Sequence, residues 1–482
     1  MTVRIRRPFA REPPVRDYYQ RREVRTRIRE YASLTEPGHP GCAYLAAMTG
    51  LEGPYATWYD APHYPPAALD RLLATGADIA RSMLDREGLL VFLDLDFQDP
   101  DDPGFAFRTP APAFGMLEPM YAAITAELLR LDMPLLPLMT GEGYHFVGRV
   151  AWSSKAISRL ASLCPETPGW LSSMAPRQPP WVHPLLGEPE ARAYAGLGMV
   201  MEHLGHEIQR HASVRCPVPV VMNGTVVGRA GRGRQCVSID LTFAGDPLDM
   251  RHLRVAFGAY QRHRWRPDIF GEDLSRTAGP LVVLPRVGSL EHLLAGGRGT
   301  AAAIELASRV DATIPDVALG AERLLDDYQA SPVAAAHRRF YAEPAMPREE
   351  WPARFDPHEW RELPPCISGS LIAPNDRLLQ PAHVQHVVRA FLSRGWPPRH
   401  IAALIQSRYA GDFRWGDRWT RMHAPTKTEV DVRVFSTLCF LGLDRLVDFN
   451  CVSAQEKGLC PMTGCRHDLR ADRHRLLERV AS

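Results

Sequence analysis

Two aspartates separated by a single residue end a strongly apolar stretch of this sequence. The stretch runs from Leu89 to Phe97, and Asp94 and Asp96 are its only polar residues. Such a run is typical of a strand buried on both faces, on which alternate residues point the same way. Neighbouring carboxylates repel each other unless a cation lies between them, and Mg²⁺ binds carboxylate and phosphate oxygens. The pair therefore predicts a magnesium site, with an acidic turn that continues to Asp102 as the structural alternative.

A third aspartate lies on another predicted strand, from Cys236 to Phe243. Alternation places Asp240 on its polar face, and the opposite face is apolar: Val237, Ile239, Leu241 and Phe243. Beside the first strand, Asp240 would complete a two-metal site, whose ions lie roughly 3.5–4 Å apart and clamp the attacking and leaving oxygens of phosphoryl transfer. Considered alone, Asp240 fits an ordinary polar strand face equally well.

A histidine follows a glycine-rich turn in the segment Thr140-Gly141-Glu142-Gly143-Tyr144-His145. Glycines let the backbone approach a ligand closely and expose N–H groups to phosphate. The imidazole of His145 could also donate a hydrogen bond to a phosphate oxygen. The alternative is a tight hairpin whose histidine makes an ordinary structural hydrogen bond.

Four cysteines near the end of the chain have the spacing C-x84-C-x8-C-x4-C, and they are Cys366, Cys451, Cys460 and Cys465. Four thiolates suggest an iron–sulfur cluster or a Zn²⁺ site. The long first gap differs from the paired ligands of a small zinc finger, and a proline after a cysteine occurs beside some iron–sulfur ligands. Scattered packing thiols are the alternative.

The elements that must position these residues mix strands and helices over the first 290 residues. Apolar periodicity predicts helices over 15–34, 66–88, 116–131 and 189–212. Strands are predicted over 89–96, within 134–150, over 218–227 and over 235–243. This mixture indicates an α+β or α/β domain. Helices are predicted over 289–345 and from 380 onward, with irregular segments over 165–190 and 343–365.

Composition sets the broad class of the protein. The 482 residues suggest about two to four domains, and a net charge of +2 does not reveal a polyanionic partner. Ten arginines gather within the first 29 residues, where they could follow a phosphate backbone or form a solvated helix face. The basic start lacks the apolar stretch of a secretory signal, and no run of about 20 apolar residues could span a bilayer. We therefore expect a cytoplasmic protein without membrane partners.

In this order, the three catalytic patterns resemble the catalytic subunit of the archaeo-eukaryotic primase superfamily. That family carries a strand-borne D-x-D, an [ST]-G-x-G-x-H turn and a later single aspartate. Here these are Asp94 and Asp96, then Thr140, Gly141, Gly143 and His145, then Asp240. Arg254-Val255 looks like the basic stretch that follows the third motif, although Arg262, His263 and Arg264 stand where family members often carry a lysine. The likeness covers roughly residues 15 to 290.

The resemblance implies an α+β fold with an RRM-like catalytic sheet backed by helices, followed by a mainly helical C-terminal domain. Asp94, Asp96 and Asp240 would hold Mg²⁺ or Mn²⁺ ions that align a primer 3′-hydroxyl with the α-phosphate of an incoming NTP or dNTP. The nucleotide would be contacted by the turn, by its histidine and by a later arginine, which are Thr140, Gly141, Gly143, His145 and Arg254.

The C-terminal region is similar to the C-terminal part of the primase large subunit. That family shows a P-x-C-[IM] opening, here Pro364-Pro365-Cys366-Ile367, then a helical body and three further cysteines. The likeness implies a [4Fe–4S] cluster ligated by Cys366, Cys451, Cys460 and Cys465, with Zn²⁺ as the alternative. In the family this domain engages the template and the initiating nucleotide. The short gap before Cys465 departs from the eukaryotic form.

Together the two resemblances predict a single-chain DNA primase or primase-polymerase that acts on single-stranded DNA. We expect a catalytic domain over 1–290, a helical connector over 291–355 and an iron–sulfur domain over 356–482. One alternative is a gap-filling or translesion polymerase that extends existing primers. The other is a non-catalytic nucleic-acid-binding protein with a structural zinc site. Besides single-stranded DNA and nucleotides, a replicative helicase or polymerase is a candidate partner.

Overall fold

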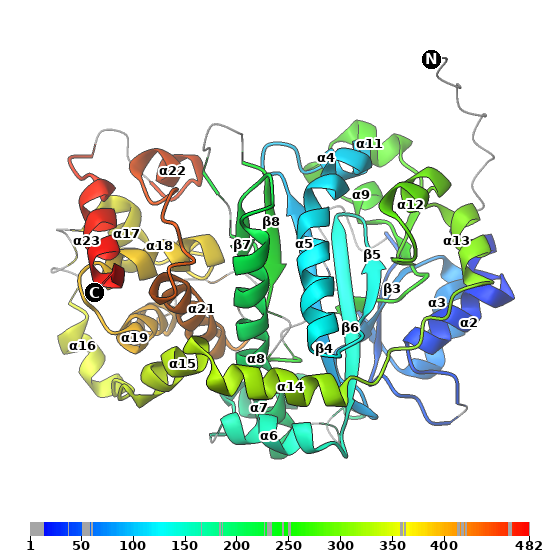
Figure 1. Ribbon diagram of the computed structural model, residues 1–482, viewed down its shortest axis with the longest axis horizontal. Helices are drawn as coiled ribbons and strands as arrows, with labels where there is room; N and C mark the ends of the chain where they lie inside the picture. Colours follow the sequence, from blue (N-terminus) through cyan, green and yellow to red (C-terminus); the bar gives the residue numbers. More distant parts are fainter. Residues whose placement is uncertain are drawn as a thin grey trace.

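The protein is a mixed α+β structure, seen in a computed structural model (Figure 1). The residues that the structure describes are 14–36, 38–50, 58, 61–164, 166–182, 185, 187–225, 227–228, 234–242, 245–248, 252–356, 360, 363–411, 415, 419, 422–460 and 465–481. Within this part of the chain, none of the helices combines the length and hydrophobicity that a membrane crossing needs.

A six-stranded sheet forms the centre of the fold. In spatial order its strands are β12 (Leu284–Pro285), β5 (Leu136–Met139), β6 (Gly143–Ala151), β4 (Gly88–Gln98), β8 (Cys236–Asp240) and β7 (Val220–Met222). Neighbours are antiparallel except β7 and β8, which are parallel. The predicted strand over 89–96 and the predicted strand pair within 134–150 are confirmed, whereas β7 is shorter than predicted.

The two faces of this sheet bury different sets of side chains. One face, which includes Leu95 and Ile239, packs against the long helices α5 (Pro110–Arg130) and α8 (Glu188–Ala212) (Figure 1). The opposite face carries Leu90 and Phe92, which belong to a second apolar cluster. Because alternate residues of β4 share a face, Asp94 and Asp96 lie on this second side, beyond the end of that cluster.

A second sheet covers that opposite face. Its strands, in spatial order, are β2 (His63–Tyr64), β1 (Leu45–Met48), β3 (Asp78–Ser82) and β9 (His252–Arg254). Helices α1 (Val15–Tyr19), α2 (Arg22–Tyr31), α3 (Leu69–Thr75) and α13 (Thr300–Ala307) complete this layer. A pair of short strands, β10 (Ala259–Tyr260) and β11 (Leu281–Val282), lies beside it.

The helix predicted over 66–88 is wrong in its second half. The helix ends at Gly76, which has φ of 76°, and the chain then forms strand β3. Only glycine adopts this left-handed conformation without strain, so it stops the helix. Ile79 and Met83 have helical spacing after α3, yet Ile79 is buried in strand β3 and Met83 just beyond its end, because a short apolar run fits either period.

The arginines of α2 are largely engaged within the protein. Arg25 and Arg29 both form ion pairs with Asp70 on α3, and Arg27 pairs with Glu30 at 2.6 Å. This arrangement favours the structural reading of the basic helix over a phosphate-binding face. Arg4, Arg6, Arg7 and Arg11 lie outside the described residues.

Shorter helices surround the two sheets and continue into a helical C-terminal region. Around the sheets lie α4 (Phe105–Arg108), α6 (Lys155–Leu163), α7 (Gly169–Met174), α9 (Arg262–Trp265), α10 (Pro267–Phe270), α11 (Glu272–Thr277) and α12 (Leu290–Gly296). Beyond them follow α14 (Ala318–Ala330), α15 (Pro332–Ala342), α16 (Trp351–Arg354), α17 (Pro365–Ile372), α18 (Pro381–Leu392), α19 (Pro398–Tyr409), α21 (Ala424–Phe440), α22 (Cys451–Glu456) and α23 (Leu469–Ala481). The predicted helical character beyond 380 is confirmed for the described residues.

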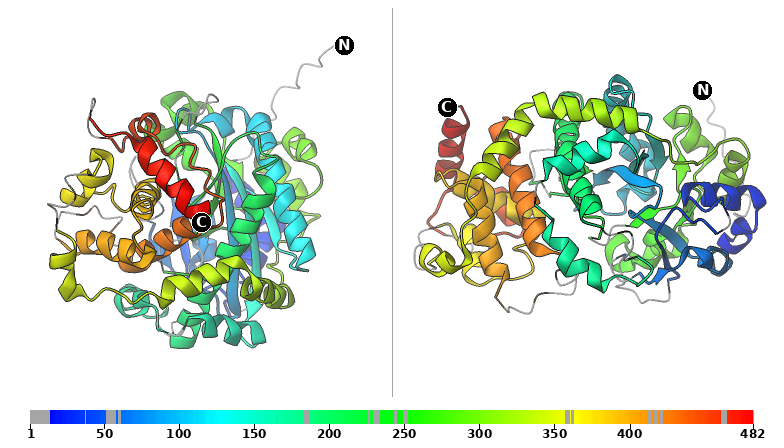
Figure 2. Two further views of the ribbon diagram at one scale, coloured as in Figure 1. Left: turned by 60° about the vertical axis from the view of Figure 1, so that its left-hand side comes forward. Right: turned by 90° about the horizontal axis from the view of Figure 1, so that it is seen from below.

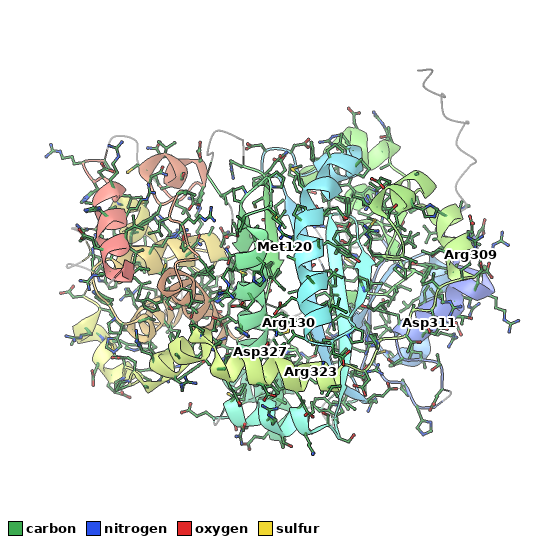
Figure 3. All side chains as sticks on the ribbon, in the orientation of Figure 1. Met120, Arg130, Arg309, Asp311, Arg323 and Asp327 are labelled. Atoms are coloured by element: carbon green, nitrogen blue, oxygen red, sulfur yellow. The ribbon has the colours of Figure 1, made fainter. Side chains whose placement is uncertain are left out.

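The C-terminal helices lie at one end of the long axis, and the α2 layer lies at the other (Figures 1 and 2). One continuous apolar cluster includes the α5–α8 face of the sheet and the cores of α18, α19 and α21. Helix α14 crosses the lower end of α5, where Arg130 pairs with Asp327 at 2.5 Å and Arg323 with Asp132 at 3.2 Å (Figure 3). The helical region is therefore packed onto the sheet through a shared core.

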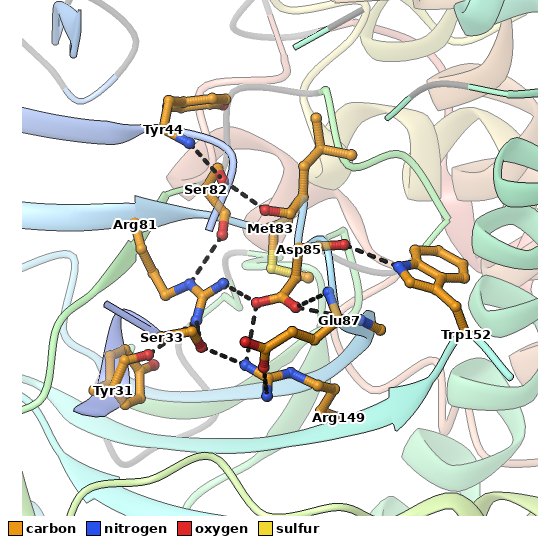
Figure 4. A network of polar contacts seen from close by, with 12 residues as sticks. Tyr31, Ser33, Tyr44, Arg81, Ser82, Met83, Asp85, Glu87, Arg149 and Trp152 are labelled. Atoms are coloured by element: carbon orange, nitrogen blue, oxygen red, sulfur yellow. Dashed lines mark hydrogen bonds and ion pairs between the residues drawn. The ribbon is translucent and has the colours of Figure 1, made fainter. Parts of the chain in front are cut away.

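A buried ionic network connects the two sheets near the end of α2 (Figure 4). The side chains of Arg81 on β3 and Asp85 in the β3–β4 turn are fully buried and form an ion pair. Arg149 on β6 reaches the same carboxylate at 3.2 Å and also bonds to Ser33. Because a buried charge is stable only when it is paired, this network fixes the β3–β4 turn that leads into Asp94.

A second buried network connects α8 with the C-terminal helices. Glu202 on α8 accepts a hydrogen bond from Arg433 on α21 and lies 2.9 Å from His337 on α15. Arg433 also donates to the hydroxyl of Tyr341 at 2.7 Å. Burial by itself would raise the pKa of Glu202, but His337 and Arg433 hold it well below its usual range.

Replacing Arg433 by methionine should destabilise the protein, because Glu202 would stay buried without its guanidinium partner. Breaking a buried pair costs about 3–5 kcal/mol, so the urea midpoint of unfolding should fall clearly. Since the folded-state pKa of Glu202 is lowered, its stabilising effect exists above its unfolded pKa of about 4.3 and is lost as the pH falls further. The exposed Arg309→Met variant is the control (Figure 3), and equal midpoints for both variants would contradict this role.

Candidate active site and cysteine group

Asp94 lies at the centre of the candidate active site, on the middle strand of three. In the sheet register it stands opposite Asp240 on β8 and opposite His145 on β6. Directly opposed residues of antiparallel strands have Cα atoms about 4.5–5.5 Å apart and share a face of the sheet. Asp96, two residues along β4, stands on the same face opposite Ser238 and Gly143. The structure therefore brings together the three aspartates and the histidine that the sequence motifs indicate.

The imidazole of His145 is neutral and close to a carboxylate. Its Nε2 atom lies 3.4 Å from Oδ1 of Asp94, and the Phe92 ring meets the imidazole edge-on with centroids 4.9 Å apart. Burial lowers the pKa of His145 to about 3, and the positive charge of Arg254 contributes to the decrease. Within the described residues, its Nδ1 atom has no hydrogen-bond partner. A neutral imidazole of this kind could donate one hydrogen bond to a ligand oxygen.

The negative charges on this face are crowded. Burial raises the pKa of Asp96 to about 7, with further increases from the charges of Glu142 and Asp240, while Arg262 and Arg254 act against the rise. Carboxylates so close together repel each other when ionised, and a bound cation would offset this repulsion. Oxygen ligands on one face of the sheet therefore fit Mg²⁺ or Mn²⁺ in their chemistry.

The end of β8 fixes the third carboxylate. Asp240 Oδ1 accepts hydrogen bonds from the backbone N–H of Thr242, at 2.8 Å, and from the Thr242 hydroxyl. Two donors on one oxygen hold the carboxylate in a single orientation. The alternation predicted for this strand is confirmed, since Val237 and Ile239 are buried in the core on the other face. Phe243 lies outside the described residues.

The glycine turn is a tight hairpin between β5 and β6. The Thr140 N–H donates to the Gly143 carbonyl at 2.9 Å, and the Gly143 N–H donates to the Thr140 hydroxyl at 3.1 Å. A Cβ at position 143 would lie 1.7 Å from the Leu95 carbonyl, and one at 141 would lie 2.7 Å from the Tyr260 ring. Close packing therefore requires both glycines. Because the Gly143 N–H is engaged inside the turn, contact between this turn and a nucleotide stays a prediction.

Positive charge borders the carboxylates. Arg254 lies between two aromatic rings, 4.2 Å from the centroid of Tyr260 and 5.0 Å from that of Trp58. Its Nε atom is 3.4 Å from Asp78, so the guanidinium is held on a rigid support. Arg262 pairs with Glu142 at 3.1 Å. Phosphate groups are suitable ligands for such arginines, because a guanidinium matches their geometry.

A cavity of about 250 Å³ opens beside this group. Its lining combines acidic, basic and aromatic side chains, among them Asp96, Asp99, Asp102, Glu142, Arg262 and Phe270. Sequence reasoning missed Glu142, although it lies within the glycine motif. It also missed Arg298, which donates to the Thr140 carbonyl at 2.6 Å. No local pattern indicates Arg298, because 157 residues separate it from the turn it supports.

The four predicted cysteines lie in one neighbourhood of the C-terminal helical region, with Cys366 on α17 and Cys451 on α22. Burial raises the pKa of the Cys366 thiol to about 12, and the nearby thiols of Cys460, Cys451 and Cys465 add to the rise. The sulfurs of Cys451 and Cys465 each lie 3.8 Å from the same carbonyl oxygen, that of His467. The residues 461–464 between the last two cysteines lie outside the described residues.

One further contact concerns the first cysteine. His386 Nε2 lies 3.3 Å from the Cys366 sulfur, on the neighbouring helix α18. Across the described parts of the chain, no three His, Cys, Asp or Glu side chains are arranged as ligands of one metal ion, either here or at the aspartates. The donor sets are nevertheless suited to their predicted ions, because thiolates bind iron and zinc and carboxylates bind magnesium and manganese.

Comparison of the chain with protein-family models, with curated proteins and with solved structures finds no match.

Proposed function

We propose that this protein is a template-dependent nucleotidyl transferase, a primase or primase-polymerase that acts on single-stranded DNA. The observation that carries the proposal is the register of three strands, which places Asp94 between Asp240 and His145 on one face of the sheet. Three carboxylates and a neutral imidazole beside two arginines match the requirements of a reaction between a hydroxyl and a nucleoside triphosphate. The RRM-like character of the sheet is part of this proposal.

The roles of the residues follow from their positions. Asp94, Asp96 and Asp240 would hold Mg²⁺ or Mn²⁺, which when bound neutralises phosphate charge and favours a deprotonated hydroxyl. Arg254 and Arg262 would attract and orient the triphosphate. His145, which is buried, would donate a hydrogen bond to a phosphate oxygen. The cavity beside Asp96 has room for part of the nucleotide.

The cysteine group supports initiation as the reaction. We propose that Cys366, Cys451, Cys460 and Cys465 ligate a [4Fe–4S] cluster, and that the surrounding helices engage the template and the first nucleotide. In such a cluster each thiolate binds a different iron, whereas in a zinc site all four sulfurs bind one ion at Zn–S distances of about 2.3 Å. Metal analysis of anaerobically purified protein distinguishes the two.

The proposal is tested by incubating the protein with a circular single-stranded template, labelled NTPs or dNTPs, and Mg²⁺ or Mn²⁺. We expect short labelled products that start without a primer and disappear when EDTA removes the divalent ions. A parallel reaction contains the same template with an annealed primer. Products only in that reaction would identify a primer-extending polymerase, and their absence from both would contradict nucleotidyl transfer.

A further inference from the structure

Asn223 stands where the sheet meets the C-terminal helices, in the turn that follows β7. It is buried and has φ of 55°, in the left-handed region that asparagine and aspartate tolerate better than other residues with a side chain. Its backbone N–H donates to the Ile239 carbonyl on β8 at 2.8 Å. This conformation aims the Asn223 amide along the end of the strand that carries Asp240.

The amide group of Asn223 makes a hydrogen bond in each direction. Its Oδ1 atom accepts from the backbone N–H of Leu241, at 3.0 Å, and its Nδ2 atom donates to Asp431 on α21, at 3.2 Å. Asp431 is buried, and its second oxygen accepts from Lys427 at 2.9 Å. A chain of three hydrogen bonds therefore runs from a lysine of the C-terminal region to the backbone beside Asp240.

The residue beyond Leu241 strengthens this connection. Thr242, which orients the Asp240 carboxylate, faces Lys427 and Asp431 across a small cavity of about 30 Å³. A shift of α21 would therefore displace both the hydrogen bond to the Leu241 N–H and the surroundings of Thr242. Buried polar chains of this kind fix geometry strongly, because each unpaired member would carry a desolvation cost.

We propose that Asn223 and Asp431 are positioning residues through which the C-terminal helices hold Asp240 in its metal-binding orientation. We call the hydrogen-bonded chain from Lys427 through Asp431 and Asn223 to Leu241 the bridge. This inference rests on the proposed function, since the bridge would position one of the three proposed metal ligands. Neither residue lines the cavity beside Asp96, so the effect is expected on metal affinity and on the rate that depends on it.

Two single variants and their combination test the bridge. In Asn223→Asp, the new carboxylate faces the carboxylate of Asp431, and no donor lies between them. In Asp431→Asn, the Asn223 amide and the Lys427 ammonium are both donors, and the new side chain offers them only one oxygen. In the double variant the Asp at 223 still accepts from Leu241, and the Asn at 431 donates to it and accepts from Lys427. Every bond of the chain is then restored with one donor reversed, at an unchanged total charge.

Mn²⁺ affinity, measured by electron paramagnetic resonance of the free ion, is the primary readout. We expect each single variant to bind Mn²⁺ about ten-fold more weakly and the double variant to bind within about two-fold of the wild type. Charge alone predicts otherwise, since Asn223→Asp adds a negative charge near the ions and would tighten binding. The exposed Asn375→Asp variant, which keeps its bond to the Arg377 N–H, controls for the substitution itself.

The outcomes separate this inference from the proposed function. If the wild type binds Mn²⁺ and the single variants bind it equally well, the bridge is overturned while the proposed function stands. If the wild type neither binds Mn²⁺ nor synthesises a product, both fail together.

Circular dichroism checks folding, and Lys427→Gln, which leaves the bond between Asn223 and Asp431 intact, replaces a single variant that does not fold. A loss of affinity of more than about two-fold in that variant supports the bridge, and affinity within about two-fold of the wild type overturns it.

Discussion

Replacing Asp240 by asparagine should lower the rate of nucleotide incorporation by on the order of 10³-fold or more. The amide keeps the size of the side chain and can still accept the hydrogen bonds from Thr242. It removes the charge that would bind a divalent ion, so the loss should appear with both Mg²⁺ and Mn²⁺. Asp94→Asn should have an effect of similar size, because the register sets the two residues opposite each other, where they would hold the same ions.

The matched control is Asp311→Asn, at an exposed position between α13 and α14 (Figure 3). Initial rates with a primed template measure incorporation without the separate demand of initiation. Unfolding midpoints of the variants should equal or exceed that of the wild type, because removing one of several crowded carboxylates relieves repulsion. Full activity of Asp240→Asn would show that this carboxylate holds no catalytic metal.

The second large effect is expected at the cysteines. Cys366→Ser should abolish the brown colour of anaerobically purified protein, with its broad absorption near about 400 nm, because a cluster that loses a thiolate ligand is unstable. Primer-independent synthesis should then fall by on the order of 10²-fold, while extension of a supplied primer is largely retained. The difference follows from the placement of the cysteine group among the C-terminal helices, whereas the aspartates lie on strands β4 and β8.

Cys439→Ser is the control for this experiment, because Cys439 is buried in α21 and has no predicted role as a ligand. Iron, sulfide and zinc are measured on the same preparations. A colourless wild type that contains one zinc ion would replace the cluster by a structural zinc site. Equal loss of initiation and extension in Cys366→Ser would contradict a specific role in starting primers.

Local sequence patterns were sufficient to predict the orientation of a side chain where that orientation depends only on its own strand. The apolar run Leu89–Phe97 predicted a buried strand that carries both aspartates on one face, and the alternation in Cys236–Phe243 predicted which side of the second strand enters the core. The glycine motif predicted a turn between two strands, and a Cβ at position 143 would indeed collide with β4. The same reasoning failed at Ile79 and Met83, since an apolar run of that length fits a helix and a strand alike.

Contacts between distant segments followed no sequence pattern. Nothing local to Arg298 indicates that it supports Thr140, and nothing in α21 indicates that Asp431 reaches Asn223 across 208 residues. Such partners depend on how whole elements pack, which is decided by many small burial terms acting together.

The sequence by itself determined the chemical groups of this protein, namely the aspartates, the glycine-flanked histidine and the cysteines, together with the alternation that orients them on their strands. Only the tertiary structure decided that β8 lies beside β4 in a register that sets Asp240 opposite Asp94. Strand order and register depend on the packing of two sheets and their helices, because a shift of β8 by one residue would move Asp240 to the face opposite Asp94 and Asp96.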